Sequence, residues 1–156
     1  MGMTLPIYNP RTMPRRVIAV DLGTRRMGVA VTDGLGLTAQ PYATLARVGG
    51  RRDLDAIAEL VARLDAERVV LGLPLDPEGN EGRAARSAHA FAERLRAVLA
   101  VPVDLIDESF TTVEAEEVLL AADLSRARRK QVVDRVAAAV ILQRWLARRD
   151  AAPGAP

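Results

Sequence analysis

The chain is 156 residues long and 49% of its residues are hydrophobic, which is enough for one globular domain with an apolar core. It contains no cysteine, so disulfides and thiolate metal sites are excluded, and it has no apolar stretch of about 18 residues that would span a membrane. We therefore expect a cytoplasmic protein with no membrane partner, in which a flexible tail (residues 1–14) precedes a single domain (15–149) and a disordered tail (150–156) follows it.

Positive charge is carried almost entirely by arginine. The formal net charge is +2, and of the 22 basic residues Lys130 is the only lysine. The basic residues cluster at Arg15–Arg16, Arg25–Arg26, Arg51–Arg52 and Arg126–Lys130. Because the planar guanidinium binds phosphate with two hydrogen bonds, such patches favour nucleic-acid binding that the small net charge would hide. Alternatively, the bias reflects the nucleotide composition of the genome, and the arginines are simply solvated on helix surfaces.

Three antiparallel strands are predicted first, over residues 17–21, 27–32 and 37–45. The first two are apolar runs on either side of a glycine turn, a pattern that is typical of a hairpin. Asp33-Gly34 marks the next tight turn, and Pro41 interrupts the third strand.

Helix and strand signals then alternate. Apolar residues recur at helical spacing over 54–64, and the continuous apolar run of 68–74 suits a parallel strand. A polar loop, a helix, a strand and two further helices follow at 75–82, 84–99, 101–106, 113–122 and 131–148. The order βββαβαβαα predicts an α/β fold with a mixed five-stranded sheet and helices on its faces. In that sheet, strands 17–21, 68–74 and 101–106 should be central and parallel.

Acidic residues lie at the ends of two of the parallel strands. Asp21 follows the run 17–20, and Asp107 and Glu108 follow the run 103–106. The carboxyl ends of parallel strands meet at one edge of an open α/β sheet, where ligands commonly bind, so these carboxylates should converge. Taken alone, Asp21 could also cap the following turn through its own side chain.

A third carboxylate comes from the last helix. Asp134 shares a helical face with Ala138, Ile141 and Trp145, and therefore lies on the stripe that faces the core. A buried carboxylate needs a cation or several hydrogen-bond donors. The alternative is an aspartate near a helix start, where the helix dipole favours it. The single histidine, His89, lies within a predicted helix and is interpreted as a surface or packing residue.

Three carboxylates without histidine or cysteine suit hard divalent cations such as Mg²⁺ or Mn²⁺, which prefer oxygen ligands. Two such ions about 3.5–4 Å apart activate a water and stabilise the leaving oxygen of a phosphodiester. The pattern therefore predicts a nuclease.

Four sequence blocks, in this order and spacing, resemble those of the YqgF (RuvX) family over about residues 16–146. They are Val20–Val31, Gly72–Leu75 with Gly79–Gly82, Asp107–Glu108 with Thr111–Ala115, and Val133–Asp134 before Ala137–Ala138. The resemblance implies a ribonuclease H-like fold, a relationship to Holliday junction resolvases, and a nuclease that matures the 5′ end of pre-16S ribosomal RNA. It also implies that Asp21, Glu108 and Asp134 are the catalytic acids and bind the metal.

Two positions depart from the family pattern. Ser109 stands where the family commonly has Arg, so an arginine does not supply the phosphate contact expected there, and Asp76 replaces a frequent Asn. Because side chains alternate along a strand, only one of Asp107 and Glu108 can point to the sheet edge. The resemblance selects Glu108 and leaves Asp107 as a neighbour that tunes it.

Further residues are candidates for holding nucleic acid. Arg25 and Arg26 lie in the turn beside Asp21 and suit substrate phosphates. A basic segment that leads into Asp134 consists of Arg126, Arg128, Arg129 and Lys130. We interpret it as a clamp on the nucleic-acid backbone, although it could be a solvated connection. Gly23 and Gly28 let the backbone turn and approach a phosphate, or are simply hairpin glycines.

Three functions remain open. The first is a metal-dependent nuclease, a monomer or a homodimer, that acts on structured RNA; four-way DNA junctions are the rival substrate, and a resolvase needs two active sites. The second is an ATPase of the actin-like group, whose Asp-x-Gly-Thr motif resembles Asp21–Thr24, but 156 residues cannot supply its two domains. The third is a non-catalytic RNA-binding assembly factor that retains the fold.

Overall fold

The computed structural model describes residues 15–108 and 126–151. The predicted tail at 1–14, the helix predicted at 113–122 and Ser109 lie outside the described residues. The described elements are β1 (Arg16–Leu22), β2 (Arg26–Thr32), β3 (Ala39–Ala46), α1 (Arg51–Arg63), β4 (Ala66–Leu73), α2 (Arg83–Val98), β5 (Val103–Asp107) and α4 (Arg126–Ala151).

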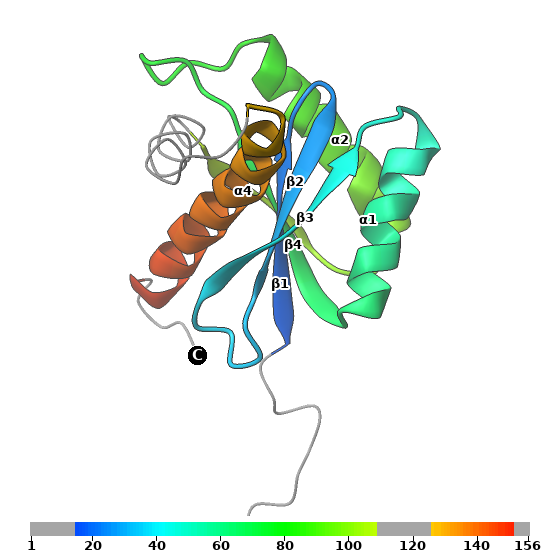
Figure 1. Cartoon of the computed structure of the whole chain (residues 1–156), viewed down its shortest axis with the longest axis vertical. Helices are drawn as coiled ribbons and strands as arrows, with labels where there is room; N and C mark the ends of the chain where they lie inside the picture. Colours follow the sequence, from blue (N-terminus) through cyan, green and yellow to red (C-terminus); the bar gives the residue numbers. More distant parts are fainter. Residues whose placement is uncertain (1–14, 109–125, 152–156) are drawn as a thin grey trace, which may run out of the picture.

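The strands form one mixed sheet in the order β3-β2-β1-β4-β5 (Figure 1). β2 is antiparallel to β1 and to β3, whereas β4 is parallel to β1 and β5 is parallel to β4. The predicted α/β fold with a mixed five-stranded sheet is confirmed, and the carboxyl ends of β1, β4 and β5 lie at one edge.

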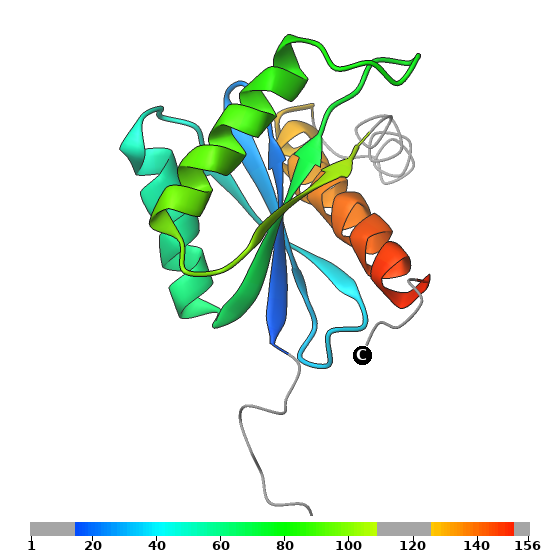
Figure 2. The ribbon, with the colours of Figure 1, turned by 180° about the vertical axis from the view of Figure 1, so that it is seen from behind.

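Helices cover both faces of this sheet. α1 and α2 lie on one face and α4 crosses the other (Figures 1 and 2). The face under α1 and α2 is built from apolar side chains that include Ile18, Val20, Leu71, Ile57 and Phe91. The face under α4 includes Val17, Ala19, Val70, Ile141 and Leu142. Because side chains alternate along β1, Asp21 belongs to the face that α4 covers.

The structure corrects one sheet position. Among the described residues, β5 pairs only with β4 and forms an edge of the sheet, so the prediction that it is central was wrong. Only Val103 and Ile106 of its five residues are buried, which is the burial expected of an edge strand. The charged Asp104 within the apolar run was the sequence feature that indicated an edge strand.

The last helix is longer than predicted. α4 begins at Arg126 rather than at Gln131, and it continues through Asp150 and Ala151, which we had assigned to the C-terminal tail. Its first turn is rich in Arg and Ala, which favour helix, but lacks the apolar periodicity on which the prediction depended. The basic segment before Asp134 is therefore helix and not a connection. None of the helices in the described ranges is both long and apolar enough to cross a membrane.

Candidate active site

Asp21 lies near the end of β1, directly opposite Gly28 of β2 in the antiparallel ladder. The end of β1 is less buried than its middle, so the carboxylate is half-buried at the rim of the sheet. This is the sheet edge at which the sequence predicted that carboxylates converge.

Glu108 follows β5 and reaches Asp21 across β4. Its backbone N–H donates to the carbonyl oxygen of Leu73 at 3.1 Å, so Glu108 continues the alignment of β5 with β4. Its side chain lies over Gly72, where an added Cβ would be 2.1 Å from Glu108 Oε2. The side chains of Glu108 and Asp21 share a hydrogen bond. Gly72, the second-last residue of β4, therefore provides the space for the second acid.

Asp134 is brought to the same place by close packing of α4 on β2. A Cβ added at Gly28 would be 1.8 Å from the backbone oxygen of Asp134, so helix and strand are in backbone contact. Since Gly28 is also the ladder partner of Asp21, this contact places Asp134 beside Asp21. Asp134 lies well past the start of α4 at Arg126, so the helix-dipole alternative does not apply.

The core-facing stripe predicted for the last helix is confirmed. Ala138 and Ile141 are fully buried, and Trp145 is half-buried. Asp134 itself is 20% exposed and accepts a hydrogen bond from Arg26, whose Nε lies 2.7 Å from Asp134 Oδ2. The sequence predicted that Asp134 needs a cation or several hydrogen-bond donors, and Arg26 of β2 supplies both a positive charge and a donor.

Within the acid cluster, which consists of Asp21, Glu108 and Asp134, the pKa values of Asp21 and Glu108 are both raised. Burial, the charge of Asp21 and the hydrogen bond to Asp21, in that order of size, together raise the pKa of Glu108 to about 9, against the opposing effect of Arg144. Burial also raises the pKa of Asp21, as does the charge of Asp134, whereas the hydrogen bond from Glu108 lowers it. At neutral pH, Glu108 is therefore protonated, and its carboxyl O–H donates a hydrogen bond to the Asp21 carboxylate.

Asp107 points elsewhere. Its Oδ2 lies 3.6 Å from Arg148 Nη2, and its backbone oxygen accepts a hydrogen bond from Arg144 Nη1 at 3.3 Å. Of the two adjacent acids, it is Glu108 that contacts Asp21, which agrees with the alternation of side chains along β5.

The predicted nucleic-acid contacts come from the β1–β2 turn and from the first turns of α4. Arg25 is exposed in the β1–β2 turn, and Gly23 closes that turn with its N–H on the backbone oxygen of Arg26 at 2.9 Å. On α4, Arg128 and Lys130 are exposed and Arg129 is half-buried; the side chain of Arg126 lies outside the described part. Other predicted features are peripheral, since His89 pairs with Glu81 on the surface and Asp76 holds the backbone N–H groups of its own loop.

The oxygen ligands suit a hard cation, but their present arrangement does not yet form a metal site. Within residues 15–108 and 126–151, no group of three acidic, histidine or cysteine side chains is placed to hold a metal ion. Asp21 and Glu108 share a proton, and Asp134 is held by Arg26. The proton on Glu108 and the guanidinium of Arg26 compensate negative charge that a divalent cation would also compensate. The three carboxylates therefore fit Mg²⁺ or Mn²⁺ once the proton leaves and the ion pair opens.

The sequence analysis did not identify Gly72 and Gly28 as positions where other groups pack against the strand backbone, and it did not identify the Arg26–Asp134 ion pair. Gly72 gave a signal, because an isolated glycine inside an apolar strand marks a close approach of another group. Gly28 gave a weaker signal, since a glycine beside a hairpin turn has a simpler explanation.

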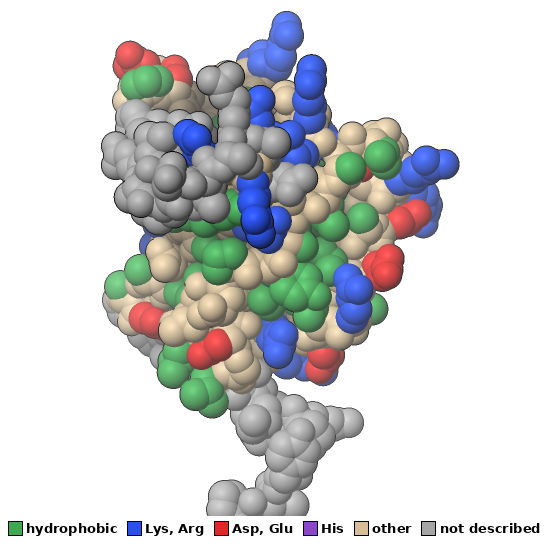
Figure 3. Space-filling view, in the orientation of Figure 1, with side chains coloured by type: hydrophobic (Ala, Val, Ile, Leu, Met, Phe, Trp, Pro, Cys, Tyr) green, Lys and Arg blue, Asp and Glu red, His purple; other side chains and the backbone are tan. Residues whose placement is uncertain are grey.

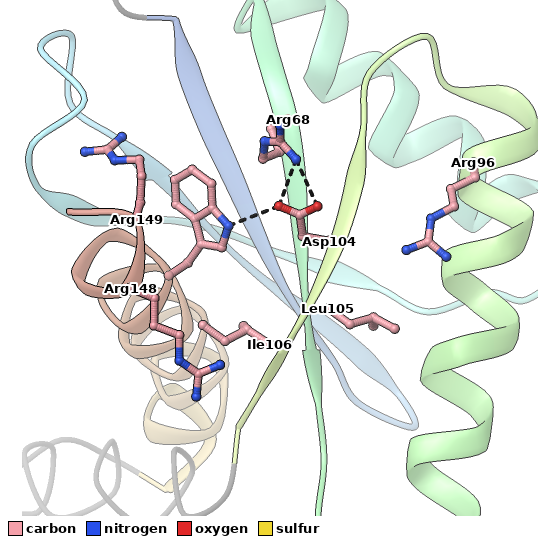
Figure 4. Close-up of a pocket in the computed structure, with 8 residues that line it drawn as sticks. Arg68, Arg96, Asp104, Leu105, Ile106, Arg148 and Arg149 are labelled. Carbon is pink, nitrogen blue, oxygen red and sulfur yellow. Dashed lines mark hydrogen bonds and ion pairs between the residues drawn. The ribbon is translucent and has the colours of Figure 1, made fainter. Parts of the chain in front are cut away.

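A second polar cluster lies beside β5, away from the acid cluster. It surrounds a cavity of about 550 Å³ lined by Arg68, Arg96, Asp104, Leu105, Ile106, Trp145, Arg148 and Arg149 (Figure 4). Asp104 accepts hydrogen bonds from Arg68 Nη1 at 2.8 and 2.9 Å and from Trp145 Nε1 at 3.1 Å. These contacts join β4, β5 and α4, and none of the predicted site residues lines the cavity.

The strand order and the position of the last helix are those of the ribonuclease H-like fold found in RuvC-type resolvases. The structure of Thermus thermophilus RuvC in complex with a Holliday junction is similar with a TM-score of 0.54 and 20% identity, over 89% of this chain and 98% of that one. The fowlpox virus resolvase in complex with Holliday junction DNA is similar with a TM-score of 0.52 and 10% identity, over 85% of this chain and 97% of that one. These similarities show the fold.

The chain belongs to the RuvX family, whose profile, described as "RuvX: Holliday junction resolvase", matches residues 15–148. A relative from Myxococcus xanthus is 50% identical over 131 residues, which are 84% of this chain and 87% of the relative. One from Moorella thermoacetica is 48% identical over 133 residues, 85% of this chain and 95% of the relative. Both relatives carry the name "Putative pre-16S rRNA nuclease". The family resemblance of the four sequence blocks is thereby confirmed.

Proposed function

We propose that this chain is a metal-dependent nuclease that hydrolyses phosphodiester bonds. The observation that carries the proposal is the acid cluster, in which the hydrogen-bonded side chains of Asp21 and Glu108 lie beside Asp134 at the rim of the sheet. Carboxylates are brought together in this way only at a cost, which a bound cation offsets.

Asp21, Glu108 and Asp134 are the proposed metal ligands, and Mg²⁺ or Mn²⁺ the proposed ions. Two bound ions would supply an activated water at neutral pH and would stabilise the charge on the leaving oxygen. Glu108 would have to lose its proton to serve as a ligand, Asp21 would face both neighbouring acids, and Gly72 and Gly28 keep the three carboxylates close. Arg25 and the basic first turns of α4 bind backbone phosphates on either side.

The proposed substrate is the 5′ end of pre-16S ribosomal RNA, which agrees with the names of relatives that are about half identical over most of this chain. Processing of ribosomal RNA would place the protein in the cytoplasm. The second candidate is a Holliday junction resolvase, which the description of the matching family favours. Because symmetric cutting of a junction needs two active sites, a stable homodimer would support the resolvase and a monomer the RNA nuclease.

The test is cleavage of a pre-16S RNA fragment and of a four-way DNA junction, side by side, with Mg²⁺, with Mn²⁺ and with chelator. Asp134→Asn and Glu108→Gln should abolish metal-dependent cutting, because each removes a ligand. Asp107→Asn is the matched control, because Asp107 is adjacent to Glu108 but pairs with Arg148, and it should retain most of the activity.

The substrate that wild type cuts decides between RNA and DNA. Binding of RNA without cutting of either substrate would contradict the nuclease and favour the non-catalytic assembly factor.

A further inference from the structure

Arg26 occupies one of the three proposed metal ligands. It is the first residue of β2, and it meets Asp134 from a position 108 residues away in the chain. Its Nε lies 2.7 Å from Asp134 Oδ2, and the two side chains are 37% and 20% exposed. A charge-assisted hydrogen bond of this length, partly shielded from water, holds the carboxylate in a fixed direction.

A metal ion cannot simply join this arrangement. Arginine stays protonated at any ordinary pH, so Arg26, unlike Glu108, cannot become neutral when a divalent cation arrives. Three carboxylates carry three negative charges, and two divalent ions exceed that by one positive charge before Arg26 is counted. The guanidinium and the ions therefore repel one another across Asp134, so bound metal disfavours the contact between Arg26 and Asp134 Oδ2.

Arg26 lies at a position from which its side chain can bind substrate instead of Asp134. Arg26 begins β2 directly after the turn that carries Arg25, at the rim where a substrate would approach the acid cluster. A guanidinium presents five N–H donors in a fork that suits phosphate oxygens, and the contact with Asp134 uses Nε.

We propose that Arg26 is a tethered cation that holds Asp134 in the metal-free protein, is displaced from it when metal binds, and then binds the substrate phosphate. This inference rests on the proposed metal-dependent nuclease and deepens it. It gives Arg26 a positioning role toward Asp134 in one state and a substrate contact in the other.

The first test measures Mn²⁺ binding to the full chain without nucleic acid, from the electron paramagnetic resonance signal of unbound Mn²⁺. Arg26→Gln should bind Mn²⁺ about three- to tenfold more tightly than wild type, because the competing cation is gone. Arg135→Gln is the matched control: it removes the same charge one residue from Asp134, but Arg135 donates to Thr44 Oγ1 at 3.1 Å. In an Asp134→Asn background, Arg26→Gln should have no effect on the affinity.

The second test measures the salt dependence of RNA binding. With Ca²⁺ present to load the site and slow cleavage, Arg26→Gln should reduce the slope of log affinity against log salt by about one phosphate contact. With chelator present, the slope should be that of wild type, since Arg26 is then held by Asp134.

The outcomes separate the inference from the function on which it rests. If wild type binds Mn²⁺ and Arg26→Gln binds it equally or more weakly, the competition is disproved and the nuclease proposal stands. If neither wild type nor Arg26→Gln binds Mn²⁺ while circular dichroism shows both folded, the metal-dependent function fails and this inference fails with it. A slope change of equal size with and without metal would contradict the move from Asp134 to phosphate.

Discussion

Gly72 and Gly28 show how two glycines on the same face of a sheet can serve one site in different ways. At Gly72 an added Cβ would meet the ends of two side chains, Glu108 Oε2 at 2.1 Å and the buried Ile141 Cδ1 at 2.7 Å. At Gly28 it would meet the backbone of Asp134, with the carbonyl oxygen at 1.8 Å. A side chain can rotate away, whereas a helix backbone cannot move without disturbing its packing, so the two positions have separate consequences.

Gly72→Ala should damage the site more than the fold. The new methyl displaces the Glu108 carboxyl group, and a displacement of about 1 Å in a catalytic group costs on the order of 100-fold in rate. Stability should fall by about 1 kcal/mol, at the low end of the cost of overpacking, because the methyl also displaces the end of the buried Ile141 side chain while alanine suits a strand better than glycine. Cleavage rate and urea denaturation measure the two effects. Unchanged cleavage would show that Glu108 is not needed at its place over Gly72.

Gly28→Ala should damage the fold itself. The methyl has to push α4 away from β2, and forcing atoms into a packed interface costs about 1–3 kcal/mol. The denaturation midpoint should fall, and cleavage should fall as well, because Asp134 moves with its backbone. Gly34→Ala is the matched control, because a Cβ at Gly34 meets nothing within 4 Å. If both variants unfolded at the wild-type midpoint, the backbone contact would be refuted.

Among the helices and strands, the sequence predicted those whose buried side chains follow a regular pattern along the chain. The β1–β2 hairpin was predictable because both strands are continuous apolar runs around Gly23. The core-facing stripe of α4 was predictable because Asp134, Ala138 and Ile141 follow the helical repeat. The edge position of β5 was not, since the order of elements along the chain does not fix the order of strands in the sheet. The Arg26–Asp134 pair depends on the distance between β2 and α4 in the folded chain, which no local pattern encodes.

The cluster of Arg68, Asp104 and Trp145 should set how firmly α4 is held to the edge of the sheet (Figure 4). Trp145→Phe removes the indole N–H that donates to Asp104 but keeps most of the ring. We expect a loss of about 1 kcal/mol of stability, typical of one hydrogen bond.

Chemical denaturation of Trp145→Phe, Asp104→Asn and the double variant measures this coupling. In the Asp104→Asn background the same tryptophan change should cost less, because the charged acceptor is gone. Equal costs in both backgrounds would mean that the hydrogen bond contributes nothing to the attachment of α4.

At the scale of the whole molecule, basic and acidic side chains are unevenly distributed. On the face seen in Figure 3, arginines and lysine are concentrated toward the end that carries the β1–β2 turn and the beginning of α4. A small net charge of +2 therefore coexists with a concentration of basic side chains at the end of the molecule that carries the half-buried acid cluster. Such a distribution attracts a polyanion to the rim and leaves the acids for cations.

The stability of the whole domain should fall as pH rises, and bound metal should oppose this fall. Because the pKa of Glu108 is raised from its model-compound value of 4.5 to about 9 on folding, the folded chain binds a proton that the unfolded chain releases. The stabilising contribution is complete below about pH 4.5 and is lost as pH rises toward 9, and the raised pKa of Asp21 acts in the same direction. In chelator, the melting temperature should therefore fall between pH 5.5 and about 8.5.

Addition of Mg²⁺ should oppose this fall, because metal binding requires the deprotonated carboxylates and is stronger at high pH. Thermal denaturation across this pH range, with chelator and with Mg²⁺, measures both slopes. Glu108→Gln should flatten the chelator profile, since glutamine does not titrate, and should remove the stabilisation by Mg²⁺. Asp107→Asn should keep the wild-type profile under both conditions. If Glu108→Gln and wild type gave the same pH profile in chelator, Glu108 would not be the protonated group. The acid cluster would then be ionised in the metal-free protein.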